Sequence, residues 1–281
     1  MCRIANSCPS VQAGIQKLHS IVLLTGIFLP DEATEQLRTY CHHRANLLNG
    51  AADTARKMQK YLRLLNLRLD VVVNEICGLT GLSIITAICK GEPNAEKLAP
   101  LRNGNRKKSE EEIAKALETN SRKDYLFSLQ QELEMYNHIQ VKLVLCDVEI
   151  EKTMNEQINN NDDKRQHHID SKSHKRINKN TPKNIDLNLF GYQYFEGVDL
   201  SAIKLVSLST ILSIMSEIGL EGIKKFPSAK HFASWLHLSP NNKINGGKVL
   251  SNKIPKESNR LKIALRNSVH LPVGRQVPFV I

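Results

Sequence analysis

The sequence predicts a mainly α-helical protein, built as a long antiparallel coiled-coil arm followed by a small basic helical domain. Three observations support this fold class. Aromatic residues make up only 5% of the 281 residues, with one Trp and 14 Gly, a composition that disfavours a β-sandwich or barrel. Two long stretches carry heptad spacing. The net charge of +11 is concentrated near the C-terminal end.

The first heptad stretch follows Pro30-Asp31-Glu32, where acidic residues favour the start of a helix. Steps of four and three residues then alternate, and only Arg44 is not apolar. The positions are Leu37, Cys41, Arg44, Leu48, Ala51, Ala55, Met58, Leu62, Leu65, Leu69, Val72 and Ile76. A helix of forty residues would span roughly 60 Å. Gly78 and Gly81 are expected to end it, and Asn49-Gly50 would allow a kink or break.

The second heptad stretch lies on a helix predicted from about Ser121 to Gln157. Its positions are Leu126, Leu129, Leu133, Tyr136, Gln140, Leu143, Asp147, Ile150 and Met154. The connection holds a short apolar segment over 82–89, a basic loop over 100–108 and a helix capped by Ser109. Two such stretches indicate an antiparallel coiled-coil arm, and an ordinary helical bundle explains the periodicity equally well.

The chain divides into four predicted parts. Residues 1–29 form a helical segment, 30–158 the arm, 159–184 a polar linker and 185–281 a C-terminal domain. Within that domain we expect two short helices between Leu200 and Gly219 and a helix capped by Ser228. A loop over 239–250, a last helix over 259–270 and an unstructured prolyl tail complete it.

Several classes of protein are disfavoured. No apolar run approaches the ~20 residues of a membrane-spanning helix, and the N-terminus lacks the apolar core of a signal peptide. The six cysteines show no Cys-x-x-Cys spacing, so we expect reduced thiols and no metal site. The sequence therefore predicts a cytoplasmic protein without a membrane partner.

The positive charge belongs to one segment. Residues 224–281 contain eleven Lys and Arg against a single acid, Glu257, a net of +10, and the other 223 residues carry +1. This imbalance favours a nucleic-acid backbone as partner, and sparse aromatics argue against base stacking as the main mode. The expected DNA contacts are Lys243, Gly246, Gly247, Lys248, Lys253, Arg260, Lys262 and Arg266.

The paired glycines of the loop allow two interpretations. Backbone amides of Gly246 and Gly247 can approach a phosphate closely, with Lys248 supplying charge. An ordinary tight turn explains the same residues.

Many short stretches together resemble the insertion-sequence 110 transposase family. They include QKLH at 16–19, LPDE at 29–32, RANLL at 44–48, LTGL at 79–82 and SEIG at 216–219. The strongest is FASWLHLSPNNKINGGK at 232–248, and the resemblance extends over residues 12–268.

The resemblance implies a recombinase that moves its own element between DNA sites, in some members with a structured guide RNA. It implies an RNase-H-like domain whose DEDD carboxylates bind magnesium, then a coiled-coil arm used in oligomerisation. A C-terminal transposase domain with a nucleophilic serine follows. A bacterial, nucleoid-associated protein that forms homo-oligomers through the arm is the corresponding expectation.

This sequence departs from the family at its catalytic positions. The first acidic residue is Asp31, and the last two family aspartates would fall at Cys8 and Val11. Magnesium chemistry needs several carboxylates, so we expect no metal cofactor in this chain. The family serine directly precedes the Gly-Gly-Lys, where Asn245 stands here, and an amide cannot become a covalent DNA-linked nucleophile.

Two further departures concern the C-terminal domain. Leu205 and Ser207 replace glycines of a phosphate-binding hairpin that many members carry, and the last helix runs into the prolyl tail after Asn267. Residues 1–29 would then be the last helix of the carboxylate domain.

Three hypotheses follow, in order of preference. The first is a truncated, degenerate transposase that binds DNA without cleaving it. The second is a non-enzymatic, self-associating DNA-binding protein that modulates an intact transposase. The third is a recombinase completed by another chain.

Overall fold

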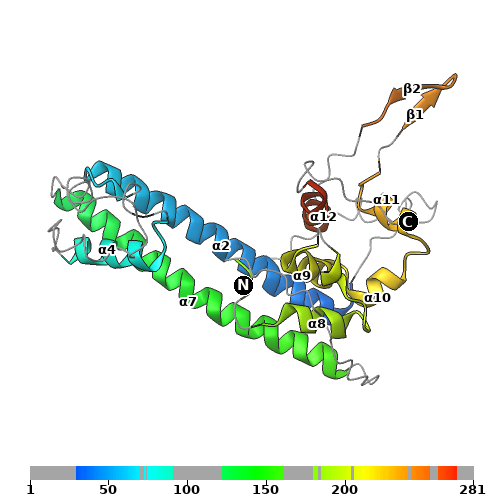
Figure 1. Ribbon diagram of the computed structural model, residues 1–281, viewed down its shortest axis with the longest axis horizontal. Coiled ribbons are helices and arrows are strands. Elements are labelled where there is room, and N and C mark those ends of the chain that lie inside the picture. The colour runs from blue at the N-terminus through cyan, green and yellow to red at the C-terminus, as the bar shows by residue number, and fades with distance from the viewer. Residues whose placement is uncertain are drawn as a thin grey trace, which may run out of the picture.

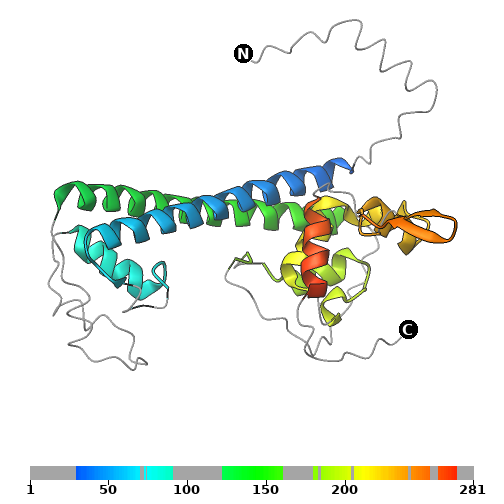
Figure 2. The same cartoon turned by 90° about the horizontal axis from the view of Figure 1, so that it is seen from above.

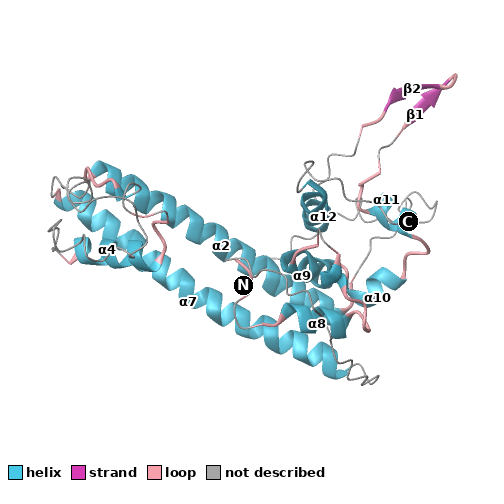
Figure 3. Ribbon diagram, in the orientation of Figure 1, coloured by secondary structure: helices cyan, strands magenta, loops and turns pink. Residues whose placement is uncertain are grey.

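The computed structural model describes residues 30–69, 73, 75–90, 122–160, 180–182, 185–203, 206–239, 242–253 and 259–270. The helix expected over 11–28, the helix capped by Ser109, nearly all of the polar linker and the prolyl tail lie outside these residues. The described part is mostly helical, which confirms the predicted fold class (Figure 3).

Two long helices dominate the molecule, α2 (Glu32–Leu64) and α7 (Lys123–Asn160). They lie side by side along their lengths and form a projecting arm (Figures 1 and 2). The shorter elements are α4 (Leu79–Cys89), α8 (Leu187–Tyr194), η2 (Leu200–Ala202), α9 (Leu208–Glu217), α10 (Gly219–Lys224), α11 (Ala229–Trp235), β1 (Lys243–Asn245), β2 (Lys248–Ser251) and α12 (Arg260–His270).

Cross-contacts show that α2 and α7 are antiparallel. The side chain of Gln157 donates to the carbonyl of Ala33 at 2.8 Å, and Lys57 pairs with Glu132 at 3.3 Å. All described positions of both heptad stretches are buried or half-buried. The two apolar stripes therefore face each other as the periodicity predicts, and a supercoiled geometry remains a prediction.

The start of α2 follows the sequence expectation. Asp31 is its N-cap and accepts from the backbone N–H of Thr34 at 3.2 Å, and Glu32 and Glu35 occupy the first turn. These acids complement the positive end of the helix dipole. The helix then passes through Asn49-Gly50 without interruption.

The predicted end of α2 is wrong, because the helix ends at Leu64 and does not reach Ile76. Asn66 adopts a left-handed conformation with φ 65°. The amide of Leu67 then donates to the carbonyl of Leu62 at 2.8 Å, with both side chains 1% exposed. This pattern is a Schellman cap, which stops a helix and keeps the following apolar residue in the core.

The predicted role of Gly78 and Gly81 is also wrong, because these glycines open α4 instead of closing α2. Gly78 is the N-cap of α4. A Cβ on Gly81 would collide with the carbonyl oxygen of Ile76, so only glycine allows the chain to pass here. The apolar segment expected over 82–89 is this helix, packed on the far end of the arm (Figure 1).

The apolar core is divided between the two ends of the arm. The far cluster joins α4 to the last half of α2 and the first half of α7. The near cluster joins the start of α2 and the end of α7 to α8 and α9. The base of the arm is therefore packed against the C-terminal unit, although the polar segment 159–184 separates the two in sequence.

The C-terminal unit is a set of short helices around a third apolar cluster. Ile218, Leu236 and Leu261 are fully buried and join the α9–α10 junction to α11 and α12. Ser228 caps α11 as predicted, accepting from the backbone N–H of His231 at 3.4 Å. Strands β1 and β2 form an antiparallel hairpin that extends away from these helices (Figure 1).

Candidate nucleic-acid interface

The segment expected to be a loop over 239–250 forms a β-hairpin. Gly246 and Gly247 have φ values of 56° and 75°, and positive φ at both residues is what a type I′ turn requires. Asn245 pairs with Lys248 on either side of this turn. The ordinary tight turn is therefore what the paired glycines make.

The hairpin presents four of the predicted site residues at its tip. Asn245, Gly246, Gly247 and Lys248 are all exposed, and no atom lies within 4 Å of where a Cβ would stand on either glycine. Lys253, two residues beyond β2, is exposed as well. Open backbone with adjacent lysine is an arrangement that can approach a phosphate.

Lys243 is the first residue of β1 and lies opposite Ser251. Residues 242–253 contain three lysines and no acid, so the whole hairpin is positively charged. Nucleic-acid phosphates are the polyanion that such a surface favours.

The other predicted contacts lie on α12, away from the hairpin (Figure 1). Arg260 opens this helix and Arg266 follows on it, and both are exposed. Lys262 is only 8% exposed and makes contacts inside the protein. Its burial leaves little surface for a phosphate contact, and its role in DNA binding stays a prediction.

Arg260 lines a cavity of about 440 Å³ between α2, α9 and α12. Several Ser and Thr residues line it, and the hydroxyls of Thr210 and Ser268 are hydrogen-bonded at 3.1 Å. Ser207 caps α9 and accepts from the backbone N–H of Thr210 at 3.2 Å. Ser207 therefore accepts a hydrogen bond from a backbone N–H at the start of α9, which a glycine at this position would leave without a side-chain partner.

A buried carboxylate joins the C-terminal unit to the arm. Glu217, at the end of α9, has a side chain 5% exposed. Its two oxygens contact Arg38 at 3.1 Å and His42 at 2.7 Å, both on α2. Two residues later Gly219 has φ 70°, and a Cβ there would collide with the hydroxyl of Thr34. These contacts attach the junction of α9 and α10 to the base of the arm.

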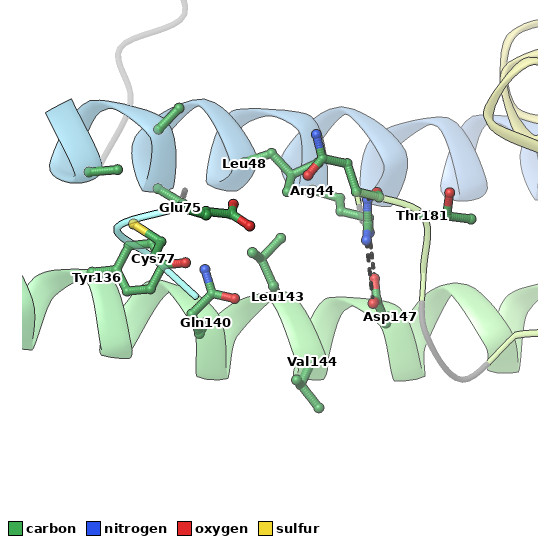
Figure 4. A pocket seen from close by; sticks show the side chains of 14 residues that line it. Arg44, Leu48, Glu75, Cys77, Tyr136, Gln140, Leu143, Val144, Asp147 and Thr181 are labelled. Carbon is green, nitrogen blue, oxygen red and sulfur yellow. Dashed lines mark hydrogen bonds and ion pairs between the residues drawn. The ribbon is translucent and has the colours of Figure 1, made fainter. Parts of the chain in front are cut away.

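A second ion pair lies inside the arm (Figure 4). Arg44 donates to Asp147 through Nε at 2.5 Å, with side chains 10% and 8% exposed, and to the carbonyl of Asn180 at 2.7 Å. It borders a cavity of about 480 Å³ between α2 and α7, where Cys77, Tyr136, Gln140 and Leu143 also lie. The charges here satisfy each other, which indicates a structural role.

The described thiols lie in different parts of the arm, with Cys146 buried and Cys41, Cys77 and Cys89 half-buried. Burial raises the pKa of the Cys41 thiol to about 12 and that of Cys89 to about 11. Burial also raises the pKa of Cys77 and Cys146. These shifts oppose thiolate formation, so none is activated as a nucleophile.

Sequence reasoning missed both ion pairs. Arg44 and Asp147 were the charged exceptions in the two heptad stretches, with opposite signs, and that was a usable signal. Glu217 belongs to the SEIG stretch of the resemblance, yet nothing in its spacing indicated burial against α2.

No described helix is long and apolar enough to cross a membrane. Within the described residues, no group of three or more His, Cys, Asp or Glu side chains is placed to hold a metal ion.

Part of the chain matches a known protein family. Residues 199–273 match the Transposase IS116/IS110/IS902 family. No curated protein and no solved structure matches the chain. The matched segment covers η2, α9, α10, α11, the hairpin and α12. The similarity to transposases of this family therefore lies within the C-terminal unit.

Proposed function

We propose that this chain acts in DNA transposition and recombination by binding duplex DNA through its C-terminal unit. The transposase domain at 199–273 supports the reaction class. The observation that carries the binding proposal is the exposed hairpin, with three lysines, no acid and an open glycine turn. Arg260 and Arg266 extend the positive surface to α12.

The test is a gel-shift titration with a mixed-sequence DNA duplex at several salt concentrations. Replacing Lys248, Lys253 and Arg260 with Glu removes three phosphate contacts. We expect weaker binding and a fall of roughly three in the slope of log affinity against log salt.

A matched control carries the same charge change on the arm, at Lys60, Lys142 and Lys152, which are all exposed. This variant is expected to bind DNA nearly as the unmodified chain does. Equal losses in the two triple variants would show that only net charge matters and would refute the placement of the interface.

We propose that the hairpin binds DNA without attacking it. Asn245 occupies the tip where the family serine is implied, and an amide is not a nucleophile for a phosphodiester. No covalent adduct should survive denaturing electrophoresis after incubation with DNA carrying the ends of the element. Adduct formation by the unmodified chain would contradict this, and Asn245→Ser tests whether the position alone limits the chemistry.

Binding should not depend on a metal, since the proposed contacts are lysines, arginines and backbone amides. Chelation with EDTA is expected to leave the gel shift unchanged. A structured guide RNA is the second polyanion proposed for the same surface. The RNA should compete with the DNA duplex for binding. The triple variant at Lys248, Lys253 and Arg260 should bind both the RNA and the DNA more weakly.

The alternative function, a self-associating protein that modulates an intact transposase, is favoured by one feature of α7. Val141, Val144, Leu145 and Val148 form an exposed apolar stripe, each 46–59% exposed. Contiguous apolar surface of this kind is typical of interfaces.

The pattern of the stripe fits a second copy of the chain. An antiparallel two-fold axis between Val144 and Leu145 would place Val141 opposite Val148 of the partner subunit. The same register would place His138 opposite Glu151 of the partner subunit. A self-complementary surface is what a two-fold dimer requires.

Sedimentation velocity tests this proposal. Val144→Glu with Leu145→Glu should convert the dimer to monomer. Met135→Glu, on α7 and 53% exposed but outside the stripe, should leave it intact. A monomeric unmodified chain would refute self-association through this face.

A further inference from the structure

Strand β2 contains one residue more than its partner. Ile244 lies opposite Val249, whereas Lys243 lies opposite Ser251, so Leu250 has no opposing residue. This irregularity is a β-bulge, which bends a strand and redirects a side chain.

The redirected side chain is apolar and open to solvent. Leu250 is 68% exposed, although it belongs to a short strand in a small hairpin. The exposed residues Lys248 and Lys253 flank it in sequence. The hairpin itself extends beyond the helices that surround the third apolar cluster (Figure 1). A large apolar side chain at a protruding position has no evident role in the fold.

We propose that Leu250 is a wedge that the hairpin inserts between neighbouring base pairs from the minor groove of duplex DNA. This inference rests on the proposed DNA binding and adds a mechanism to it. Leucine is among the residues that enter base steps in this way, and the inserted side chain unstacks the step and kinks the duplex.

The charge around Leu250 selects DNA over a protein partner. Residues 242–253 carry three positive charges and no negative one. Lysines on both sides would contact the two phosphate backbones. The leucine side chain would then move from solvent into the apolar space between two stacked base pairs. A protein-binding leucine is more often found in an apolar patch with a mixed polar rim.

The hairpin has dimensions that suit this role. Paired strands lie about 5 Å apart and are admitted by DNA grooves in known β-ribbon proteins. The two-residue turn of Gly246 and Gly247 keeps the tip narrow, since neither glycine carries a side chain. The bulge places Leu250 in β2, three residues after the Gly246-Gly247 turn.

The experiment measures binding and bending separately on one DNA probe. The probe is a mixed-sequence duplex of about 24 base pairs, roughly 80 Å long, with a donor dye and an acceptor dye at opposite ends. Fluorescence anisotropy reports binding of the full chain, and energy transfer between the dyes reports bending. The unmodified chain is expected to bind and to bend the duplex by roughly 20–90°.

Leu250→Ala should bind within a few-fold of the unmodified chain but lose most of the increase in energy transfer. Leu250→Met, which keeps a long apolar side chain, should retain the bend. Leu79→Ala is the matched control, because that leucine is 91% exposed at the far end of the arm, and it should change neither signal. Folding is not at risk, since all of these side chains are mainly in solvent.

A second readout separates the wedge from the charges beside it. Lys248→Gln should lower the salt slope of binding by about one. Leu250→Ala should leave that slope unchanged, because it removes no phosphate contact.

The outcomes distinguish the wedge from the proposed function. Equal bending by Leu250→Ala and the unmodified chain overturns the wedge and leaves DNA binding in place. An unmodified chain that binds the duplex without bending it also overturns the wedge and leaves DNA binding in place. An unmodified chain that gives no anisotropy change with the duplex overturns the proposed DNA binding and the wedge with it.

Discussion

Removing one partner of the ion pair inside the arm should destabilise the protein more than removing both. Arg44 and Asp147 are 10% and 8% exposed and meet at 2.5 Å. Arg44→Met would leave the Asp147 carboxylate buried without a counter-charge, which typically costs about 3–5 kcal/mol. The double variant Arg44→Met with Asp147→Leu removes both charges and fills similar space. It should be within roughly 1 kcal/mol of the unmodified chain, or more stable.

Urea unfolding followed by circular dichroism at the helix band measures this cycle. With an unfolding slope of about 3 kcal/mol per molar urea, the single variants should lower the midpoint by roughly 1–1.7 M. The contact of Arg44 with the carbonyl of Asn180 adds to its loss, so Arg44→Met should cost more than Asp147→Leu.

The interaction energy of the cycle decides the matter. An interaction energy of several kcal/mol is expected for a buried pair, because each single variant is strongly destabilised and the double variant is nearly as stable as the unmodified chain. Single variants that each cost under about 1 kcal/mol would refute the reasoning, because such small effects belong to ion pairs on a solvated surface.

Three further predictions concern the junction, the hairpin and the thiols. Gly219→Ala should cost more free energy of unfolding than Gly247→Ala in urea titration. Both substitutions place alanine at positive φ, at about 1–2 kcal/mol each, but only the first meets a threonine hydroxyl of α2. Glu217→Gln should destabilise by about 1.5–3 kcal/mol by the same measurement, since the amide has no charge to pair with Arg38 and one acceptor oxygen where the carboxylate has two. Cys41 should resist alkylation at pH 8 in the native chain and react once urea unfolds it, read by site-resolved mass spectrometry. A pKa raised to about 12 from 9.0 lowers its thiolate fraction roughly a thousandfold, and its reaction should therefore speed up as pH rises.

Periodicity predicted the long elements well, because the helix repeat and the apolar face are both local properties. The inward faces of α2 and α7 follow from it, as does the position of α7. The end of α2 was missed because Leu65 and Leu69 stay in the core after the helix stops. The spacing of apolar residues indicates which residues are buried. It does not indicate that Asn66 adopts a left-handed backbone conformation.

Contacts between distant segments were beyond sequence reasoning. The connection between α2 and α7 sets which turn of one helix meets which turn of the other, and no local pattern encodes that register. Arg44 and Asp147 were therefore recognisable as exceptions but not as partners. Likewise Lys262 is part of a basic run, and only the packing of α12 buries it.

The hairpin was predicted in part. Asn-Gly-Gly-Lys is a strong turn signal, but the flanking residues are too few and too polar to identify strands. The extra residue at Leu250 depends on a pairing register that three- and four-residue strands do not reveal.

The length of the arm makes it a lever. With 33 residues in α2, the far end lies about 50 Å from the base. Each degree of rotation at the base would therefore move the far end by roughly 0.9 Å, and ten degrees would displace it by nearly the diameter of a helix. The position of the far end therefore depends more on the angle between the arm and the C-terminal unit than on the stiffness of the arm near that end. The junction, where Glu217 and Gly219 meet α2, is thus the place where a single substitution would have its largest mechanical reach.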